Sequence, residues 1–208
     1  MGYPVPKTAI FLSYRREDSI ETAGRMYSWL DMRLSAMIFL DVRSIWPGAN
    51  YRTAMETALE EAEVVLVIIG KSWSAITRPE GVMRRLEEPD DAVRQEIELS
   101  LARRKAIIPI LTQGVTMPSR ADLPDSIRAF ADLNALPVRS EPDFDNDMRT
   151  LRTAIDRLSP GLPWHTPFVP MSAPPPAPGY PPPPQPQPAP TAKSTSIMSR
   201  MWRTLRSR

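Results

Sequence analysis

The residues best suited to chemistry are charged side chains at the ends of apolar runs. Glu96 lies in a stretch with helical periodicity, and Arg15 and Arg16 follow a short apolar run that ends at Tyr14. A carboxylate at the margin of a helix's buried stripe can face a cleft, and guanidinium groups at a strand's end can pair with phosphate or carboxylate. We expect these two stretches and the charged loop from Asp41 to Tyr51 to share one rim.

Each of these candidates also has a simpler interpretation. Glu96 can be a solvated helical carboxylate paired with Arg94 or another neighbour, as charges on helix surfaces commonly are. Glu98 offers the same chemistry and the same alternative. Paired arginines in a loop, such as Arg15 and Arg16, are also common in ordinary solvated turns.

A third candidate is the charged loop from Asp41 to Tyr51, which follows an apolar strand and contains Pro47 and Gly48. Trp46 in this loop can stack on an aromatic ring of a ligand or on a neighbouring protomer. It can equally lie against its own domain. The loop therefore borders a binding site, contacts a neighbouring protomer or packs on its own domain.

Composition excludes several classes of site. The chain has no cysteine, so it has no ligands for a thiolate metal site, and its single histidine, His165, lies among prolines, so we expect neither a zinc site nor a Ser/His/Asp triad. None of its eight glycines forms a GxGxxG or P-loop pattern, which argues against a Rossmann dehydrogenase or an NTPase. We expect neither a metal ion nor a cofactor.

The net charge of +2 hides two segments of opposite sign. Residues 1–159 carry a charge of −3, whereas residues 160–208 carry +5 and no Asp or Glu. The basic isoelectric point therefore comes from the end of the chain, and we expect no nucleic-acid partner.

Periodicity predicts alternating strands and helices. Strands are expected at 8–14, 36–42, 64–69, 106–111 and 134–138, and helices at 20–34 (with Asp18 or Ser19 as N-cap), 51–62, from Asp90 or Asp91 to Leu101, 123–131 and 144–158. Such connections are too long for hairpins, so they predict right-handed crossovers and a five-stranded parallel sheet with helices on both faces. The most apolar strand, 64–69, is expected at its centre. Gly24, inside the first helix, predicts close approach of another element.

The C-terminal part has a different composition, since 15 of the 25 prolines lie in residues 160–208. We divide the chain into a domain at 1–159, a Pro-rich disordered linker at 160–192 and a basic amphipathic tail at 193–208. The linker is either a spacer or a ligand for an SH3-like domain. The tail suits an anionic membrane or a partner's acidic groove. Without a signal peptide or a long apolar run, we expect a cytoplasmic protein, peripheral to the membrane at most through this tail.

Three motifs in this order resemble the Toll/interleukin-1 receptor (TIR) domain family, particularly its bacterial members. Phe11-Leu12-Ser13-Tyr14-Arg15-Arg16 is similar to the family's box 1, and Phe39-Leu40-Asp41-Val42 through Pro47-Gly48 is similar to box 2 with its BB loop. Val93-Arg94-Gln95-Glu96-Ile97 matches a V-R-x-E-I helix segment. The resemblance covers residues 7–158 and implies a flavodoxin-like TIR fold.

The resemblance implies two alternative functions. Many TIR domains cleave NAD+ at the nicotinamide–ribose bond, by hydrolysis or with cyclisation, and others are non-catalytic TIR–TIR interaction modules. The family's catalytic glutamate maps onto Glu96, and Pro47 and Gly48 fall in its interaction loop. The implied partners are NAD+ as substrate and other TIR domains in a homo-oligomer. Ala92 replaces an aromatic residue of some NAD+-cleaving members, a place that Trp46 or Trp73 is expected to fill. The expected substrate-binding residues are Tyr14, Arg15, Asp41, Ser44, Ile45, Trp46 and Trp73.

Overall fold

The computed structural model describes residues 8–40, 50–79 and 81–165. The chain divides into two compact units, residues 1–167 and 168–208, and all described residues belong to the first. The loop at 41–49, the linker beyond residue 165 and the basic tail at 193–208 lie outside the described residues. Within those residues, no helix is both long and apolar enough to cross a membrane.

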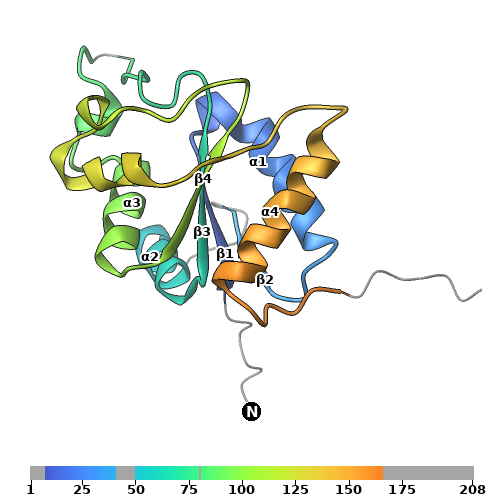
Figure 1. The fold of residues 1–208 in the computed structure, drawn as a ribbon. Coiled ribbons are helices and arrows are strands. Elements are labelled where there is room, and N and C mark those ends of the chain that lie inside the picture. Colours follow the sequence, from blue (N-terminus) through green and yellow to red (C-terminus); the bar gives the residue numbers. More distant parts are fainter. Residues whose placement is uncertain (1–7, 41–49, 80, 166–208) are drawn as a thin grey trace, which may run out of the picture. The chain divides into compact units, whose positions relative to one another are not determined.

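The sheet has five strands in the order β2-β1-β3-β4-β5, and every pairing is parallel. This order confirms the predicted flavodoxin-like sheet, with the apolar strand at its centre (Figure 1). Every residue of that central strand is buried, as expected for a strand with helices on both faces. The strands are β1 (Thr8–Ser13), β2 (Met37–Phe39), β3 (Val64–Ile69), β4 (Ala106–Leu111) and β5 (Leu136–Pro137).

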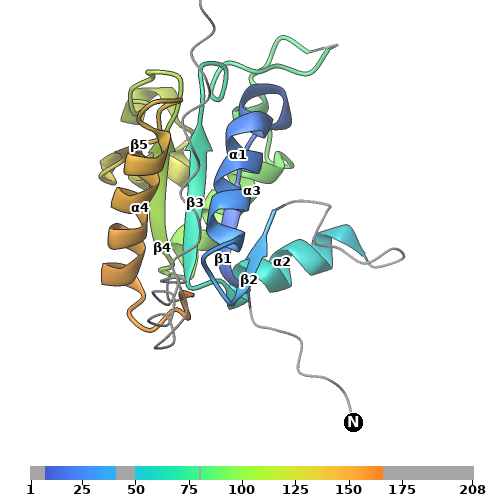
Figure 2. The same ribbon diagram turned by 90° about the vertical axis from the view of Figure 1, so that its right-hand side faces the viewer.

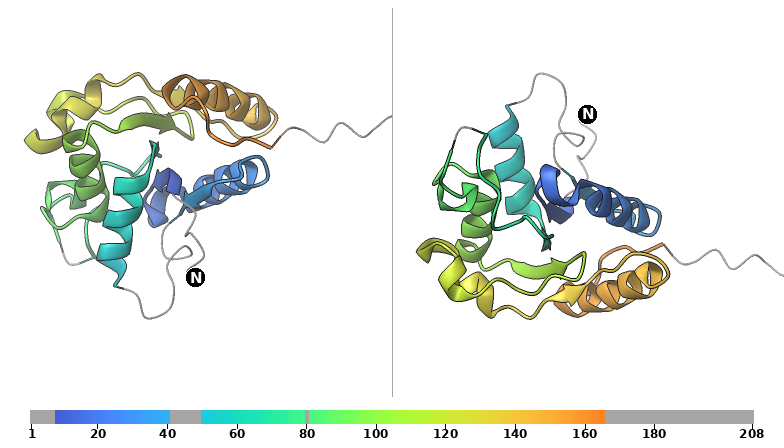
Figure 3. Two further views of the ribbon diagram at one scale, coloured as in Figure 1. Left: turned by 90° about the horizontal axis from the view of Figure 1, so that it is seen from below. Right: turned by 90° about the horizontal axis from the view of Figure 1, so that it is seen from above.

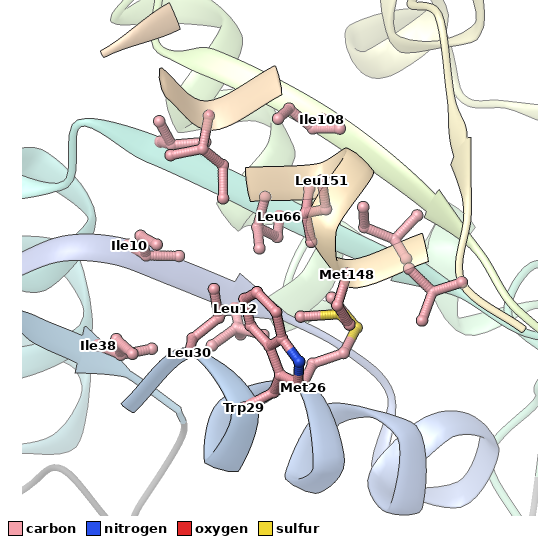
Figure 4. Packing of buried hydrophobic residues seen from close by; sticks show 14 of the residues in the cluster. Ile10, Leu12, Met26, Trp29, Leu30, Ile38, Leu66, Ile108, Met148 and Leu151 are labelled. Carbon is pink, nitrogen blue, oxygen red and sulfur yellow. The ribbon is translucent and has the colours of Figure 1, made fainter. Parts of the chain in front are cut away.

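Helices α1 (Arg16–Asp31) and α4 (Phe144–Leu158) cover one face of the sheet (Figures 1 and 3). Figure 4 shows Met26 of α1 beside Met148 of α4, while Leu30 of α1 lies against β1. These three side chains are fully buried in one cluster with residues of β1, β3 and β4. The spacing of apolar residues therefore identifies the packing faces of both helices, except at two ends, where Ile20 of α1 and Leu158 of α4 are exposed.

The opposite face carries α2 (Tyr51–Glu61), α3 (Ala92–Ala102) and the 3₁₀ helix η4 (Asp125–Asp132) (Figures 1 and 3). Their apolar residues form a second buried cluster with β3 and with Phe11 of β1. Between β3 and α3 the chain extends past the carboxyl end of the sheet (Figure 2) and includes the short 3₁₀ helix η2 (Arg85–Glu87). A further short 3₁₀ helix, η3 (Arg120–Asp122), precedes η4.

The start of α1 differs from the prediction, because the helix begins at Arg16 and neither Asp18 nor Ser19 is its N-cap. The Asp18 carboxylate instead accepts hydrogen bonds from the backbone N–H groups of Gly70, at 2.8 Å, and Ser72, at 2.7 Å. Ser19 has non-helical dihedral angles and marks a kink inside the helix. Asp18 therefore ties α1 to the chain just after β3.

Two other expectations need correction. A Cβ atom added at Gly24 would meet nothing within 4 Å, so no element approaches this glycine closely. The domain also extends past the boundary expected at residue 159. Leu162 is buried in the core, and the backbone N–H of Ser35 donates to the carbonyl of Pro163 at 2.8 Å. The first residues assigned to the linker thus pack on the domain.

Candidate functional site

A cleft of about 150 Å³ lies where β1 and β2 end and α3 begins. Such an edge, beyond the carboxyl ends of parallel strands, is where ligands bind in this class of sheet. The cleft brings together the strand end and the helix that the sequence predicted to share one rim. Its lining residues are Phe11, Leu12, Tyr14, Arg15, Arg16, Glu17, Phe39, Arg85, Ala92, Val93 and Glu96.

The wall of the cleft is held by a buried ion pair between Arg15 and Asp91. Nη1 and Nη2 of Arg15 donate to the two carboxylate oxygens of Asp91 at 2.9 and 3.0 Å, and both side chains are almost fully buried. The Nε of Arg15 donates to the carbonyl of Trp73 at 2.7 Å. Arg15 was predicted to bind substrate, but its guanidinium already holds three segments of the chain together.

Asp91 also begins the helix that carries the candidate carboxylate. As the N-cap of α3, it accepts a hydrogen bond from the backbone N–H of Arg94 at 3.0 Å, which confirms one of the two predicted caps. The same side chain therefore fixes the start of α3 and its contact with the end of β1. Glu96 lies five residues along the helix from this anchor.

Glu96 is only 7% exposed, although it belongs to a helix on the surface of the domain. It lines the cleft and also a groove of about 460 Å³ between α2 and α3. Arg94, the expected surface partner, pairs with Glu98 at 2.7 Å. The sequence did not decide between a solvated and a cleft-facing Glu96, and the structure places it at the cleft.

Glu98 instead interacts with side chains of its own domain, Arg94 and Ser126. Burial disfavours its ionised form, yet hydrogen bonds from Ser126 and Arg94 hold the pKa of this carboxyl below its ordinary value. Glu98 lines the groove between α2 and α3 but not the cleft. It is thus a natural control for experiments on Glu96.

The remaining predicted residues have different positions. Tyr14 is partly buried and lines the cleft. Trp73 does not line it; this side chain is 1% exposed in the core, where its ring stacks on Phe130 with centroids 6.0 Å apart. Ala92 lines the cleft at the position where some NAD+-cleaving members of the family carry an aromatic residue. Trp73 therefore does not replace that aromatic residue. The predicted residues Asp41, Ser44, Ile45, Trp46, Pro47 and Gly48 lie outside the described residues.

Sequence reasoning missed Arg85, which enters the cleft from η2. Its Nη1 lies 3.1 Å from Glu17 and its Nε 3.4 Å from the buried carboxylate of Asp91. Arg85 belongs to the mixed-charge run Arg84-Arg85-Leu86-Glu87-Glu88, which has neither helical nor strand periodicity. The available signal in the sequence was Leu86, an apolar residue between charged ones. Leu86 is completely buried and anchors this turn to the domain.

The site combines a nearly buried carboxylate with cationic groups in a partly enclosed cleft. A carboxylate in this setting can stabilise positive charge that develops on a bound sugar, because a low local dielectric strengthens the interaction. Among the described residues, no group of three or more His, Cys, Asp or Glu side chains is arranged to hold a metal ion.

Comparisons with known proteins agree with this fold. A family model described as "TIR domain" matches residues 10–152. The TIR domains of the activated Roq1 resistosome, which directly recognises the pathogen effector XopQ, align with a TM-score of 0.54 and 13% identity, covering 71% of this chain and 99% of that one. No curated protein matches the sequence.

Two further solved structures are more distant. A metazoan TIR-STING receptor from C. gigas has a TM-score of 0.45 and 16% identity, covering 73% of this chain and 41% of that one. The TIR domain of the Toll-related receptor TRR-2 from Hydra magnipapillata has a TM-score of 0.45 and 16% identity, covering 70% and 96%.

Proposed function

The chain belongs to the TIR domain family, and we propose that it is an NAD+ nucleosidase that cleaves the nicotinamide–ribose bond with Glu96 as its catalytic residue. The observation that carries this proposal is the position of Glu96. Its carboxylate is nearly buried, lines the cleft at the carboxyl end of β1 and is distinct from the neighbouring Glu98, which pairs with Arg94.

The proposed reaction needs no metal ion. As the bond between C1′ and the nicotinamide nitrogen breaks, its electron pair leaves with the ring, which becomes neutral, and positive charge develops on the ribose. The Glu96 carboxylate stabilises this charge and accepts hydrogen bonds from the ribose hydroxyls. Water then attacks C1′ and releases a proton to give ADP-ribose, or a nucleophilic group of the same molecule closes a ring.

We further propose that the active form is a homo-oligomer of TIR domains. The similar Roq1 domains come from an activated resistosome, and the loop with Pro47 and Gly48 matches the family's interaction loop. An assembly in which this loop contacts a neighbouring protomer would couple turnover to self-association.

The test is nicotinamide release from NAD+ by the purified full chain, alone and with a crowding agent that promotes assembly. We expect the rate of nicotinamide release per mole of protein to increase with protein concentration and with crowding. Absence of nicotinamide under all conditions would contradict the enzymatic proposal.

One observation favours the second candidate function, a non-catalytic TIR–TIR interaction module. Ala92 leaves the cleft wall without an aromatic side chain at this position, and Trp73 lies in the core. A module of this kind would self-associate without releasing nicotinamide. Light scattering in parallel with the turnover assay distinguishes the two functions.

A further inference from the structure

Three arginines line the cleft, and one of them, Arg16 at the start of α1, is exposed. Arg15 is buried, and its guanidinium is already bound bidentately by Asp91. Arg85 has a side chain that is 29% exposed and comes from η2, outside the three motifs that resemble the family. It is therefore a cation that a ligand in the cleft can reach.

Two contacts prepare this guanidinium to bind an anion. On one side its Nε lies 3.4 Å from the buried Asp91 carboxylate, which anchors the group in the cleft. On the other side its Nη1 lies 3.1 Å from Glu17, whose side chain is 59% exposed. Exposed ion pairs of this kind contribute little free energy, so a stronger anion can displace Glu17. A guanidinium has five N–H donors and binds phosphate bidentately.

The cleft is lined by groups of opposite charge. Glu96, on α3, provides a carboxylate that suits the cationic nicotinamide riboside part of a dinucleotide, whereas Arg85, before α3, provides a cation. The cleft volume of about 150 Å³ is smaller than that of typical ligand sites, about 300 Å³ or more, so a dinucleotide that contacts both Glu96 and Arg85 extends beyond this space.

We propose that Arg85 binds the diphosphate of a dinucleotide substrate and that Glu17 is an intramolecular competitor for the same guanidinium. The inference rests on the proposed NAD+ cleavage for its substrate, but its anion-binding step is independent of turnover. Ligand binding exchanges the Glu17 carboxylate for phosphate oxygens, while Asp91 keeps the arginine in place.

The first experiment measures ADP binding to the full chain by calorimetry, with adenosine as the ligand that lacks the diphosphate. We expect Arg85→Gln to weaken ADP binding about ten- to a hundredfold, the effect of losing charge-assisted hydrogen bonds. Glu17→Gln should strengthen it, because the competing carboxylate is gone. Arg84→Gln is the matched control, since this neighbouring arginine pairs with Glu87 and does not line the cleft.

The second experiment compares turnover of NAD+ with that of nicotinamide riboside, which has the same scissile bond and no phosphate. Arg85→Gln should lower kcat/KM for NAD+ about ten- to a hundredfold and leave that for nicotinamide riboside unchanged. Equal losses for both substrates would overturn the proposal.

The ADP titration decides the matter even if the wild-type protein releases no nicotinamide, so the two proposals can fail separately. Wild-type protein that does not bind ADP, or equal ADP affinities for Arg85→Gln and Arg84→Gln, would overturn the role of Arg85. Glu17→Gln does not alter the contact with Asp91, so its effect on affinity tests the competition without disturbing the buried ion pair.

Discussion

The buried pair of Arg15 and Asp91 predicts a large and specific loss of stability on Asp91→Ala. Both side chains are almost fully buried, and their two hydrogen bonds of 2.9 and 3.0 Å join the end of β1 to the start of α3. Removing one partner leaves the other charge buried and uncompensated, which costs about 3–5 kcal/mol. The loss of the N-cap alone accounts for about 1 kcal/mol of such a change.

The matched control is Glu60→Ala, which removes an ion pair with Arg103 at 2.7 Å whose side chains are 51% and 56% exposed. Solvent screening limits that pair to about 0–1 kcal/mol. The assay is urea unfolding of both variants and the wild type, with the free energy of unfolding obtained from the midpoint and slope. We expect Asp91→Ala to lower this free energy by several times as much as Glu60→Ala.

The double variant Arg15→Met with Asp91→Ala gives a second criterion. Because it removes both charges, it should be more stable than the sum of the two single changes predicts. An Asp91→Ala variant that loses no more stability than Glu60→Ala would refute the view that this pair holds the cleft wall.

Three further predictions concern the stability of the fold. Gly70→Ala should destabilise by about 1–3 kcal/mol in urea unfolding, because its Cβ would lie 2.3 Å from the Asp18 carboxylate and force it from its backbone donors. Gly24→Ala, with open space around the new Cβ, should instead stabilise by up to about 1 kcal/mol; destabilisation there would contradict the geometry. Hydrogen bonds from Arg139 hold the pKa of Asp147 below its ordinary value, so the ionised form stabilises the fold above the ordinary Asp pKa of about 3.9, and this contribution is lost as the pH falls through the lowered value. Asp147→Asn should therefore reduce the loss in free energy of unfolding that the wild type shows as the pH falls into the acid range. A variant with the same loss as the wild type would contradict this.

Much of the fold could be predicted because it depends on local patterns. The six consecutive apolar residues of β3 indicated a central parallel strand, and the spacing of apolar residues in α4 indicated its buried face. Asp91 before an apolar periodic stretch indicated a helix N-cap. These features lie within one element, so the sequence around them carries the information.

The supports of the site could not be predicted, because they join residues far apart in the chain. Arg15 and Asp91 are separated by 76 positions, and Asp18 reaches Gly70 across 52. A local pattern shows that such side chains are charged but not which partner burial gives them. For the same reason Asp18 was predicted as a helix cap, and Arg85 could not be told from Arg84.

The central claim is that Glu96, and not a neighbouring surface carboxylate, performs the chemistry of the cleft. The most direct measurement is the rate of nicotinamide release from NAD+ by the wild type, Glu96→Gln and Glu98→Gln at equal concentrations of folded protein. We predict that Glu96→Gln loses activity by about a hundredfold or more, as expected for removing electrostatic stabilisation of the transition state, whereas Glu98→Gln stays within a few-fold of the wild type. An active wild type whose Glu96→Gln variant keeps its full rate would contradict the claim.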